Sequence, residues 1–241
     1  MNLWQPVAAV KMANFIKDIL PVNEIIFDGS VVDPNSLDVF SDVDMKILLA
    51  YNDSLNIKSF IQELPKQFYP VFGYEIHNYN EHDVLRLCFE NGWCFDFTFV
   101  YPQPRESQTA DSYFFNKVDS VINQFWFLSV GVLTKLGRND FLIASHLALE
   151  LCQLIIVIQM LIRDDEKKTN IHRFGDGEDV PVLRSLVSNE RDSFSMETKN
   201  EILNILFNAS KGMDKIASTV FPEYIERSEK LIDLQRQYNL L

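Results

Sequence analysis

The first hundred residues show a changing periodicity of apolar positions that predicts both helices and strands. Residues 1–20 form an amphipathic pattern typical of a helix, and the apolar run at residues 24–29 predicts a short strand. Between residues 39 and 50, apolar side chains recur with a period of two, which indicates a strand with one buried face. Residues 54–69 return to helical spacing and begin with a serine, a favoured N-terminal cap.

Residues 84–100 predict a β-hairpin. Two runs rich in β-branched and aromatic residues flank Asn91-Gly92, the dipeptide that gives the strongest short-range signal for a hairpin turn. The predicted order is therefore helix, strand, strand, helix and an antiparallel pair. Such an order indicates the α+β class, with a small mixed sheet accompanied by helices.

From about residue 110 onward, strand patterns give way to helical spacing, which predicts an α-helical bundle. Residues 101–110 contain two prolines in a polar context, a composition typical of a linker. We therefore predict a first domain over residues 1–105 and a helical second domain over residues 106–241.

One helical segment, residues 141–162, is apolar and long enough to span a membrane. Within it, His146, Glu150 and Gln153 are spaced i, i+4 and i+7 and form a single polar stripe. Because an ionisable side chain is costly in lipid, we interpret the segment as a buried helix with one face on a cleft or a partner.

Composition narrows the class of protein. A hydrophobic share of 47% is that of a folded globular chain, and the net charge of −12 argues against a general nucleic-acid binder and suits a cationic small molecule. The three cysteines, Cys88, Cys94 and Cys152, cannot all pair and match no zinc spacing, so we expect reduced thiols. Residues 1–20 lack the features of a signal peptide, so we expect a cytoplasmic protein.

Candidate chemistry is concentrated where the first predicted strand ends and the second begins. Gly29 allows backbone N–H groups to approach an anion closely, and the hydroxyl of Ser30 adds a donor. Asp42 and Asp44 follow after eleven intervening residues. Since residues i and i+2 of a strand project from the same face, we expect the two carboxylates to converge.

A third carboxylate, Asp96, lies in the second strand of the predicted hairpin. Alternation places it on the face opposite the aromatic rings of its neighbours, and an isolated acid in so apolar a strand is costly unless a cation or hydrogen bonds offset its burial. Magnesium prefers carboxylate oxygens and keeps other positions for water or phosphate. Two or three convergent aspartates are therefore suited to one or two Mg²⁺ ions.

A Gly-Ser pair, an Asp-x-Asp motif and a later strand-borne aspartate, in this order, resemble the signature of the polymerase-beta-type nucleotidyltransferase superfamily. The succession of a small domain and a helical domain resembles the streptomycin (aminoglycoside 6-) adenylyltransferases and the lincosamide nucleotidyltransferases. Residues 123–144 are similar to their helical domain, in which an aromatic pair precedes a basic-rich turn and a long apolar helix. Val31 and Val32 depart from the basic or small polar residue that many of these enzymes have after Gly-Ser.

The resemblance implies transfer of NMP, with AMP from ATP as the first choice, to a hydroxyl of a small molecule such as an aminoglycoside or lincosamide, releasing pyrophosphate. Gly29 and Ser30 would bind the triphosphate of ATP or another nucleoside triphosphate. Asp42 and Asp44 would bind Mg²⁺. Asp96 would complete this catalytic metal site and could act as general base.

The second domain would bind the acceptor substrate, and four of its residues are candidates. Lys135 and Arg138 lie three apart near a predicted helix end and could reach triphosphate oxygens, or they could be solvated charges near a helix C-terminus. His146 and Glu150 could line the acceptor pocket, or they could make a polar contact inside the bundle. The sequence leaves both pairs of alternatives open.

Residues 164–181 form an irregular stretch that interrupts the helical half. Its His172 and Arg173 could contact nucleotide. Because a loop with two glycines and scattered charge usually needs no function, we interpret the stretch as a connection.

Two other functions fit the same motifs. A related enzyme could transfer NMP to a protein or tRNA, as in toxin-antitoxin pairs, although the acidic charge speaks against tRNA. A non-catalytic nucleotide-binding module is a further alternative, but three convergent carboxylates repel one another without metal. We expect a small-molecule hydroxyl acceptor as partner, no membrane, no nucleic acid, and a monomer or homodimer.

Overall fold

The computed structural model describes residues 3–33, 35–51, 55–105, 114–168 and 198–240. The chain divides into two compact units, residues 1–110 and residues 111–241. The first contains a mixed five-stranded sheet with helices, and the described part of the second contains helices. The fold therefore belongs to the predicted α+β class. His172 and Arg173 lie outside the described residues.

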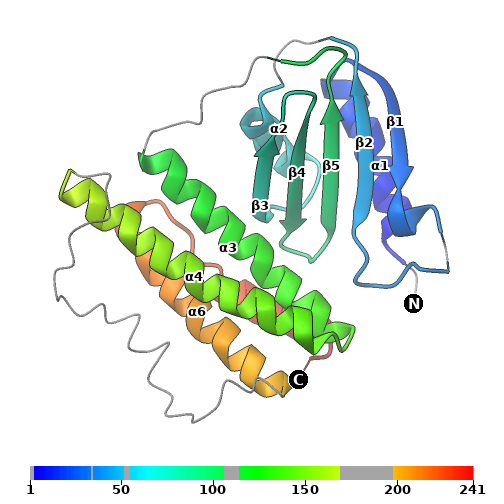
Figure 1. The fold of residues 1–241 in the computed structure, drawn as a ribbon. Coiled ribbons are helices and arrows are strands. Elements are labelled where there is room, and N and C mark those ends of the chain that lie inside the picture. Colours follow the sequence, from blue (N-terminus) through cyan, green and yellow to red (C-terminus); the bar gives the residue numbers. More distant parts are fainter. Residues whose placement is uncertain (1–2, 34, 52–54, 106–113, 169–197, 241) are drawn as a thin grey trace. The chain divides into compact units, whose positions relative to one another are not determined.

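The sheet of the first unit has the strand order β1-β2-β5-β4-β3 (Figure 1). Strand β2 runs antiparallel to β1 and parallel to β5, and β4 is antiparallel to both β5 and β3. The elements in chain order are α1 (Gln5–Ile19), β1 (Val22–Asp28), the 3₁₀ helix η1 (Gly29–Val31), β2 (Val43–Leu49), α2 (Ile57–Glu63), the 3₁₀ helix η2 (Leu64–Lys66), β3 (Val71–Asn78), β4 (His82–Phe89) and β5 (Cys94–Val100).

One face of this sheet, together with α1 and α2, encloses the hydrophobic core of the first unit (Figure 1). Phe60 of α2 lies edge-on against Phe97 and Phe99 of β5, with ring centroids 5.7 and 5.4 Å apart. Every second side chain of β2 and β5 is buried in this core: Val43, Met45, Ile47, Leu49, Phe95, Phe97 and Phe99. Because side chains alternate between faces, Asp44 and Asp96 project from the opposite face.

The turn between β4 and β5 fixes their register. Gly92 has a left-handed φ of 82°, and its N–H donates to the carbonyl of Phe89 at 2.9 Å. The N–H of Phe89 donates to the carbonyl of Trp93 at 2.8 Å, which closes a three-residue loop with glycine in the left-handed position. This register places Arg86 opposite Asp96 across the hairpin.

Three details of the predicted elements in this unit are wrong. Strand β3 was not expected, although Phe72, Tyr74 and Ile76 alternate with polar residues and glycine along it. The second strand begins at Val43, because the preceding residues form a turn. Helix α2 is capped by Asn56, whose side chain accepts a hydrogen bond from the N–H of Ser59, and the expected serine cap lies outside the described residues.

The expectation of reduced cysteines is also wrong for one pair. Cys88 and Cys94 form a disulfide, and Cys152 is the free cysteine of the described chain. The hairpin register explains this pairing, since Cys88 of β4 and Cys94 of β5 are direct cross-strand partners. A sequence reading that paired the strands through the Asn91-Gly92 turn would have placed the two sulfur atoms side by side.

The second unit is helical in its described part. Helix α3 packs along α4, and α6 packs against α4 and α3, while α7 contacts both α3 and α6. The helices are α3 (Phe114–Gly137), α4 (Phe141–Glu166), α6 (Lys199–Val220) and α7 (Ser228–Gln237). Helix α6 starts with a capping box in which Thr198 and Glu201 satisfy each other's backbone N–H groups, a pattern that fixes a helix N-terminus.

Helix α4 is less buried than predicted. One face is buried in the unit through Ala144, Ala148 and Leu151, but Leu142 on the other side is 83% exposed. His146 is also exposed on this outer side. This residue of the predicted polar stripe therefore lies on the exposed face of the helix. Of the described helices, α4 alone is long and apolar enough to cross a membrane. This is weak evidence for a membrane span, because core helices of soluble proteins pass the same test.

A buried carboxylate joins α6 to the start of α7. Asp214 is 4% exposed, and its Oδ1 accepts hydrogen bonds from the hydroxyl of Tyr224 (2.9 Å) and the N–H of Arg227 (3.0 Å). Its Oδ2 accepts from the N–H of Ser228 at 2.9 Å. The carboxylate therefore satisfies backbone donors at the N-terminus of α7, where the helix dipole also favours negative charge.

We expect Asp214→Asn to lower the free energy of unfolding by about 1–3 kcal/mol, because an amide nitrogen cannot accept the hydrogen bonds that the carboxylate accepts. Chemical denaturation measures this loss. The matched control is Asp233→Asn on α7, which removes only an exposed pairing with Arg236 and should change stability by less than about 0.5 kcal/mol. Equal effects of the two substitutions would contradict a stabilising role for the Asp214 network.

Candidate functional site

The turn that carries Asp42 is held by the first helix. Gln5 of α1 is fully buried, and its Nε2 donates to the backbone oxygens of Asp38 (2.6 Å) and Ser41 (2.9 Å). Within the turn, the hydroxyl of Ser41 donates to Oδ1 of Asp38 at 3.0 Å. Asp42 lies one residue before β2, so these contacts fix the backbone from which its carboxylate projects. The sequence reading missed this role of Gln5.

The strand pairing brings Asp44 and Asp96 together. These residues are direct partners in the parallel pair of β2 and β5, and Asp28 of β1 is the partner of Asp44 on its other side. One ligand atom each from Asp42, Asp44 and Asp96 lies within 4.8 Å of the other two, and all three residues are half-buried. The described chain therefore contains the convergent carboxylates that the sequence predicts.

The separation of these carboxylates fits a small divalent cation. Magnesium binds oxygen at about 2.0–2.1 Å, so two ligands on opposite sides of one ion lie about 4.2 Å apart. The aspartate oxygens lie within 4.8 Å of one another, which is close to this separation. Carboxylate oxygen is also the ligand type that Mg²⁺ prefers, so the donor set suits this metal.

Gly29 makes room for the cluster. Its φ of 63° is left-handed, and a Cβ at this position would lie 2.1 Å from Oδ2 of Asp44. Its N–H donates to Oδ1 of Asp28 at 2.7 Å, so this donor is engaged inside the protein. The glycine is therefore needed for the close approach of backbone to Asp44, which is a different use from the expected contact with phosphate.

Ser30 follows directly in η1 and carries a hydroxyl group in an unusual state. Its Oγ is buried and has no hydrogen-bond partner among the described residues. A buried hydroxyl without a partner is destabilising, and such groups occur at sites that receive a ligand. The expected role of this hydroxyl as a donor to a phosphate oxygen stays a prediction.

Burial and mutual repulsion favour the neutral forms of two carboxyls. Burial raises the pKa of Asp96 to about 7, with the charge of Asp42 as the second cause, while Arg86 acts in the opposite direction. Burial also raises the pKa of Asp44, and the charges of Asp42 and Asp28 add to this shift. A cation bound among these groups would reverse both effects.

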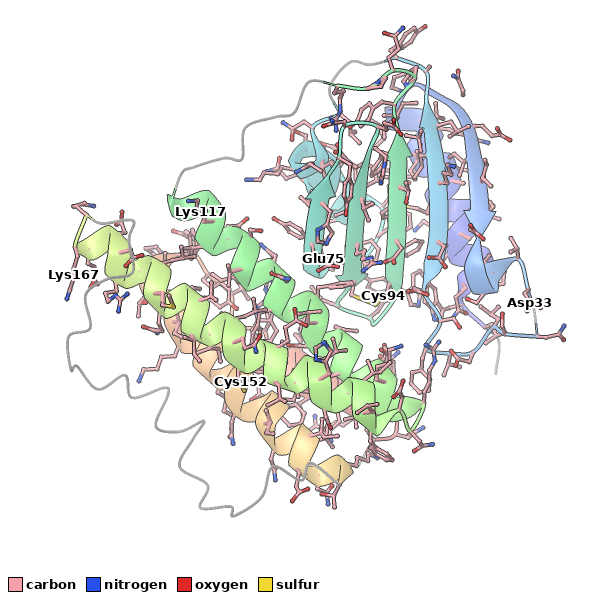
Figure 2. All side chains as sticks on the ribbon, in the orientation of Figure 1. Asp33, Glu75, Cys94, Lys117, Cys152 and Lys167 are labelled. Carbon is pink, nitrogen blue, oxygen red and sulfur yellow. A yellow bond between two sulfur atoms is a disulfide. The ribbon has the colours of Figure 1, made fainter. Side chains whose placement is uncertain are left out.

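A row of charged residues crosses the whole sheet at the level of the site. Strand register places five residues side by side, in the order Asp28, Asp44, Asp96, Arg86 and Glu75 from β1 to β3. Glu75 is labelled on β3 in Figure 2, at the far end of this row. Arg86 is the single cation of the row, and the sequence reading did not include it.

The other predicted site residues belong to the second unit. Lys135 is half-buried in the last turn of α3, and Arg138 is exposed one residue after the helix end. His146 is exposed and Glu150 is half-buried on α4. Their expected roles toward triphosphate and acceptor stay predictions, because the structure defines each unit separately.

Comparison with known proteins does not show a family for this chain. No protein-family model matches the chain, and no curated protein matches it either. Among solved structures, the chain is similar to an aminoglycoside 6-adenyltransferase from Bacillus subtilis, with 14% sequence identity, a TM-score of 0.34 and 98% of each chain covered. Identity and TM-score at these values leave family, activity and substrate open.

Proposed function

We propose that the protein is a magnesium-dependent nucleotidyltransferase that moves NMP, with AMP from ATP as the first choice, to a hydroxyl of a small molecule. The observation that carries the proposal is the convergence of three carboxylates on one sheet face. Their ligand atoms lie within 4.8 Å of one another, directly beside Gly29 and Ser30. Such a cluster suits a reaction whose main requirement is charge neutralisation around a triphosphate.

Each residue of the site would have a separate role. Asp42 and Asp44 would hold Mg²⁺, and the Ser30 hydroxyl would donate to a phosphate oxygen. Bound Mg²⁺ supplies Lewis-acid neutralisation of the charge on the phosphoryl oxygens. Gly29 permits the backbone of η1 to lie against Asp44, so the phosphate-binding turn and the carboxylates are held close together.

Transfer forms a bond between the acceptor oxygen and the α-phosphorus and breaks the bond from that phosphorus to the bridging oxygen, so pyrophosphate leaves. The acceptor hydroxyl loses its proton in this step, and Asp96 is the proposed base. Asp96 would also complete the metal site, and its Oδ2 contacts Arg86 at 3.0 Å.

The second unit would supply the acceptor site. In this proposal, Lys135 and Arg138 bind triphosphate oxygens, and His146 and Glu150 contact the acceptor. The net charge of −12 supports a cationic acceptor such as an aminoglycoside, with a lincosamide as the second choice. Antibiotic modification, transfer to a protein and a purely nucleotide-binding role are distinguished by the experiment below.

The decisive experiment is magnesium-dependent pyrophosphate release from each of the four ribonucleoside triphosphates, with and without a panel of aminoglycosides and lincosamides. We expect one acceptor class to trigger release. Asp42→Asn should lower turnover at least about 100-fold, because loss of a metal ligand removes several kcal/mol of transition-state stabilisation and each 1.36 kcal/mol is a factor of ten.

The matched control is Asp18→Asn, which makes the same change at an exposed position on α1 and should leave turnover unchanged. Divalent-cation binding is measured in parallel, since it does not need the acceptor. Undiminished cation binding by Asp42→Asn would remove Asp42 from the metal site. Triphosphate binding without release by any acceptor would favour protein modification or a nucleotide-binding role.

Gly29→Ala should weaken divalent-cation binding at least about tenfold, because the added Cβ would displace Asp44 and the left-handed backbone would be strained. Ser30→Ala is the comparison, since it removes only the hydroxyl. This variant should bind the cation normally and bind the nucleoside triphosphate more weakly. Calorimetric titrations with metal and then with triphosphate check both expectations, and a similar loss of cation affinity in both variants would contradict the separate roles.

Without divalent cation, stability should depend on pH through Asp96. Its pKa is about 7 in the folded protein and about 3.9 when unfolded, so its protonation stabilises the fold below about pH 4 and this contribution is lost as the pH rises through about 7. Relative to wild type, Asp96→Asn should become more stable from pH 4 to pH 7, by at most about 4 kcal/mol. Denaturation across this range, repeated with Mg²⁺, is the test; a constant difference would refute it.

A further inference from the structure

Arg86 of β4 lies between two carboxylates on neighbouring strands. It is the register partner of Asp96 on β5 and of Glu75 on β3. Its Nε is 3.0 Å from Oδ2 of Asp96, and its Nη1 donates to Oε1 of Glu75 at 3.3 Å. The side chain of Arg86 is 47% exposed, whereas those of Asp96 and Glu75 are 23% and 11% exposed. The guanidinium group is therefore held at two points by less exposed acids.

The two contacts use different edges of the guanidinium plane. A planar group with donors in fixed directions transmits orientation from one partner to the other, which the rotating ammonium of lysine does not. Nε of Arg86 contacts Oδ2 of Asp96, so the rotation of this carboxylate is coupled to Arg86, and one of its oxygens belongs to the cluster with Asp42 and Asp44. Arg86 thus contacts Glu75 on β3 through one group and Asp96 on β5 through another.

The positive charge of Arg86, considered alone, would weaken cation binding at the site. A guanidinium group beside three carboxylates repels a divalent cation and should weaken its binding. Orientation of a ligand by an outer partner strengthens binding, and removal of such a partner typically lowers metal affinity 10–100-fold. If removal of Arg86 weakens cation binding, orientation of Asp96 is the dominant effect. If removal strengthens cation binding, charge repulsion is the dominant effect.

We propose that Arg86 is a positioning residue of the metal site, which holds Asp96 through Oδ2 so that Oδ1 faces Asp42 and Asp44. Glu75 supports this role by holding the guanidinium from β3. The inference rests on the proposed function, because it concerns the same site. It adds two residues that act through Asp96 and do not themselves touch the cation.

The test is direct binding of Mn²⁺, with free Mn²⁺ followed by electron paramagnetic resonance, so it needs no acceptor and no turnover. Arg86→Met should weaken binding about 10–100-fold. Arg86→Lys keeps the charge but loses the fork, and it should recover only part of the affinity. Lys46→Met is the matched control, since Lys46 is an exposed cation on the same face of β2 that is not paired with Asp96; it should bind Mn²⁺ as well as wild type or better.

Two further measurements separate positioning from other effects. In the Asp96→Asn background, Arg86→Met should cause little additional loss, because Arg86 acts through Asp96. Binding at about pH 8.5 should show the same loss as binding at about pH 7, because a change in ligand orientation, unlike a change in protonation, does not disappear as the pH rises. Glu75→Gln should weaken binding in the same direction as Arg86→Met, but less.

Tighter or unchanged binding by Arg86→Met would overturn the inference, as would a loss that vanishes at the higher pH or persists undiminished in the Asp96→Asn background. Circular dichroism verifies that each variant is folded. Failure of the proposed function has a different signature, since wild type would then fail to bind Mn²⁺ or Asp42→Asn would bind it normally. Loss in Asp42→Asn without loss in Arg86→Met refutes the role of Arg86 alone.

Discussion

The register of strand β2 is the constraint on which the first unit depends. Val43, Met45 and Ile47 occupy the buried face, so Asp44 must project from the other face. A slip by one residue would bury Asp44 and expose its apolar neighbours, which makes the register strongly specified. The same register pairs Asp44 with Asp28 on one side and with Asp96 on the other. The hydrophobic core therefore determines which charges meet on the opposite face.

Charges that meet in this way destabilise the fold on which they depend. Like charges on directly opposite positions of neighbouring strands repel, and partial burial strengthens the repulsion. Burial, and after it the charge of Asp42, raises the pKa of Asp96 to about 7. The phenylalanines on the other face of β5 are buried in the core, and burial of each aromatic side chain contributes a few kcal/mol. The buried aromatic face of the sheet thus stabilises a strand register that repulsion between carboxylates on the other face destabilises.

Much of this unit could be predicted from the sequence, because alternation and turn residues act locally. The alternation around Asp44 and Asp96 placed both on the face opposite the core, and Asn91-Gly92 located the hairpin. What escaped prediction depends on pairing between strands. The contact of Arg86 with Asp96 and the bond between Cys88 and Cys94 follow only when residues are counted outward from the turn.

In the second unit, the sequence predicts the helices but not which of their faces are buried. Helical periodicity identifies α3 and α4, but it does not state which face of a long apolar helix is covered. The stripe containing His146 and Glu150 was assigned to a buried helix, and yet His146 is exposed beside Leu149. Burial of a helix face is decided by its neighbours in space, so the sequence predicted the element and not its surroundings.

The charges of the site do not balance one another. Asp42, Asp44 and Asp96 carry three negative charges when ionised, and Arg86 offsets one of them. Arg86 cannot enter the cluster itself, because its guanidinium is already held by Asp96 and Glu75. The remaining repulsion is relieved either by protonation, which disables the carboxylates as ligands, or by a divalent ion. Local instability of this kind is typical of functional sites, where a ligand completes what the chain leaves unbalanced.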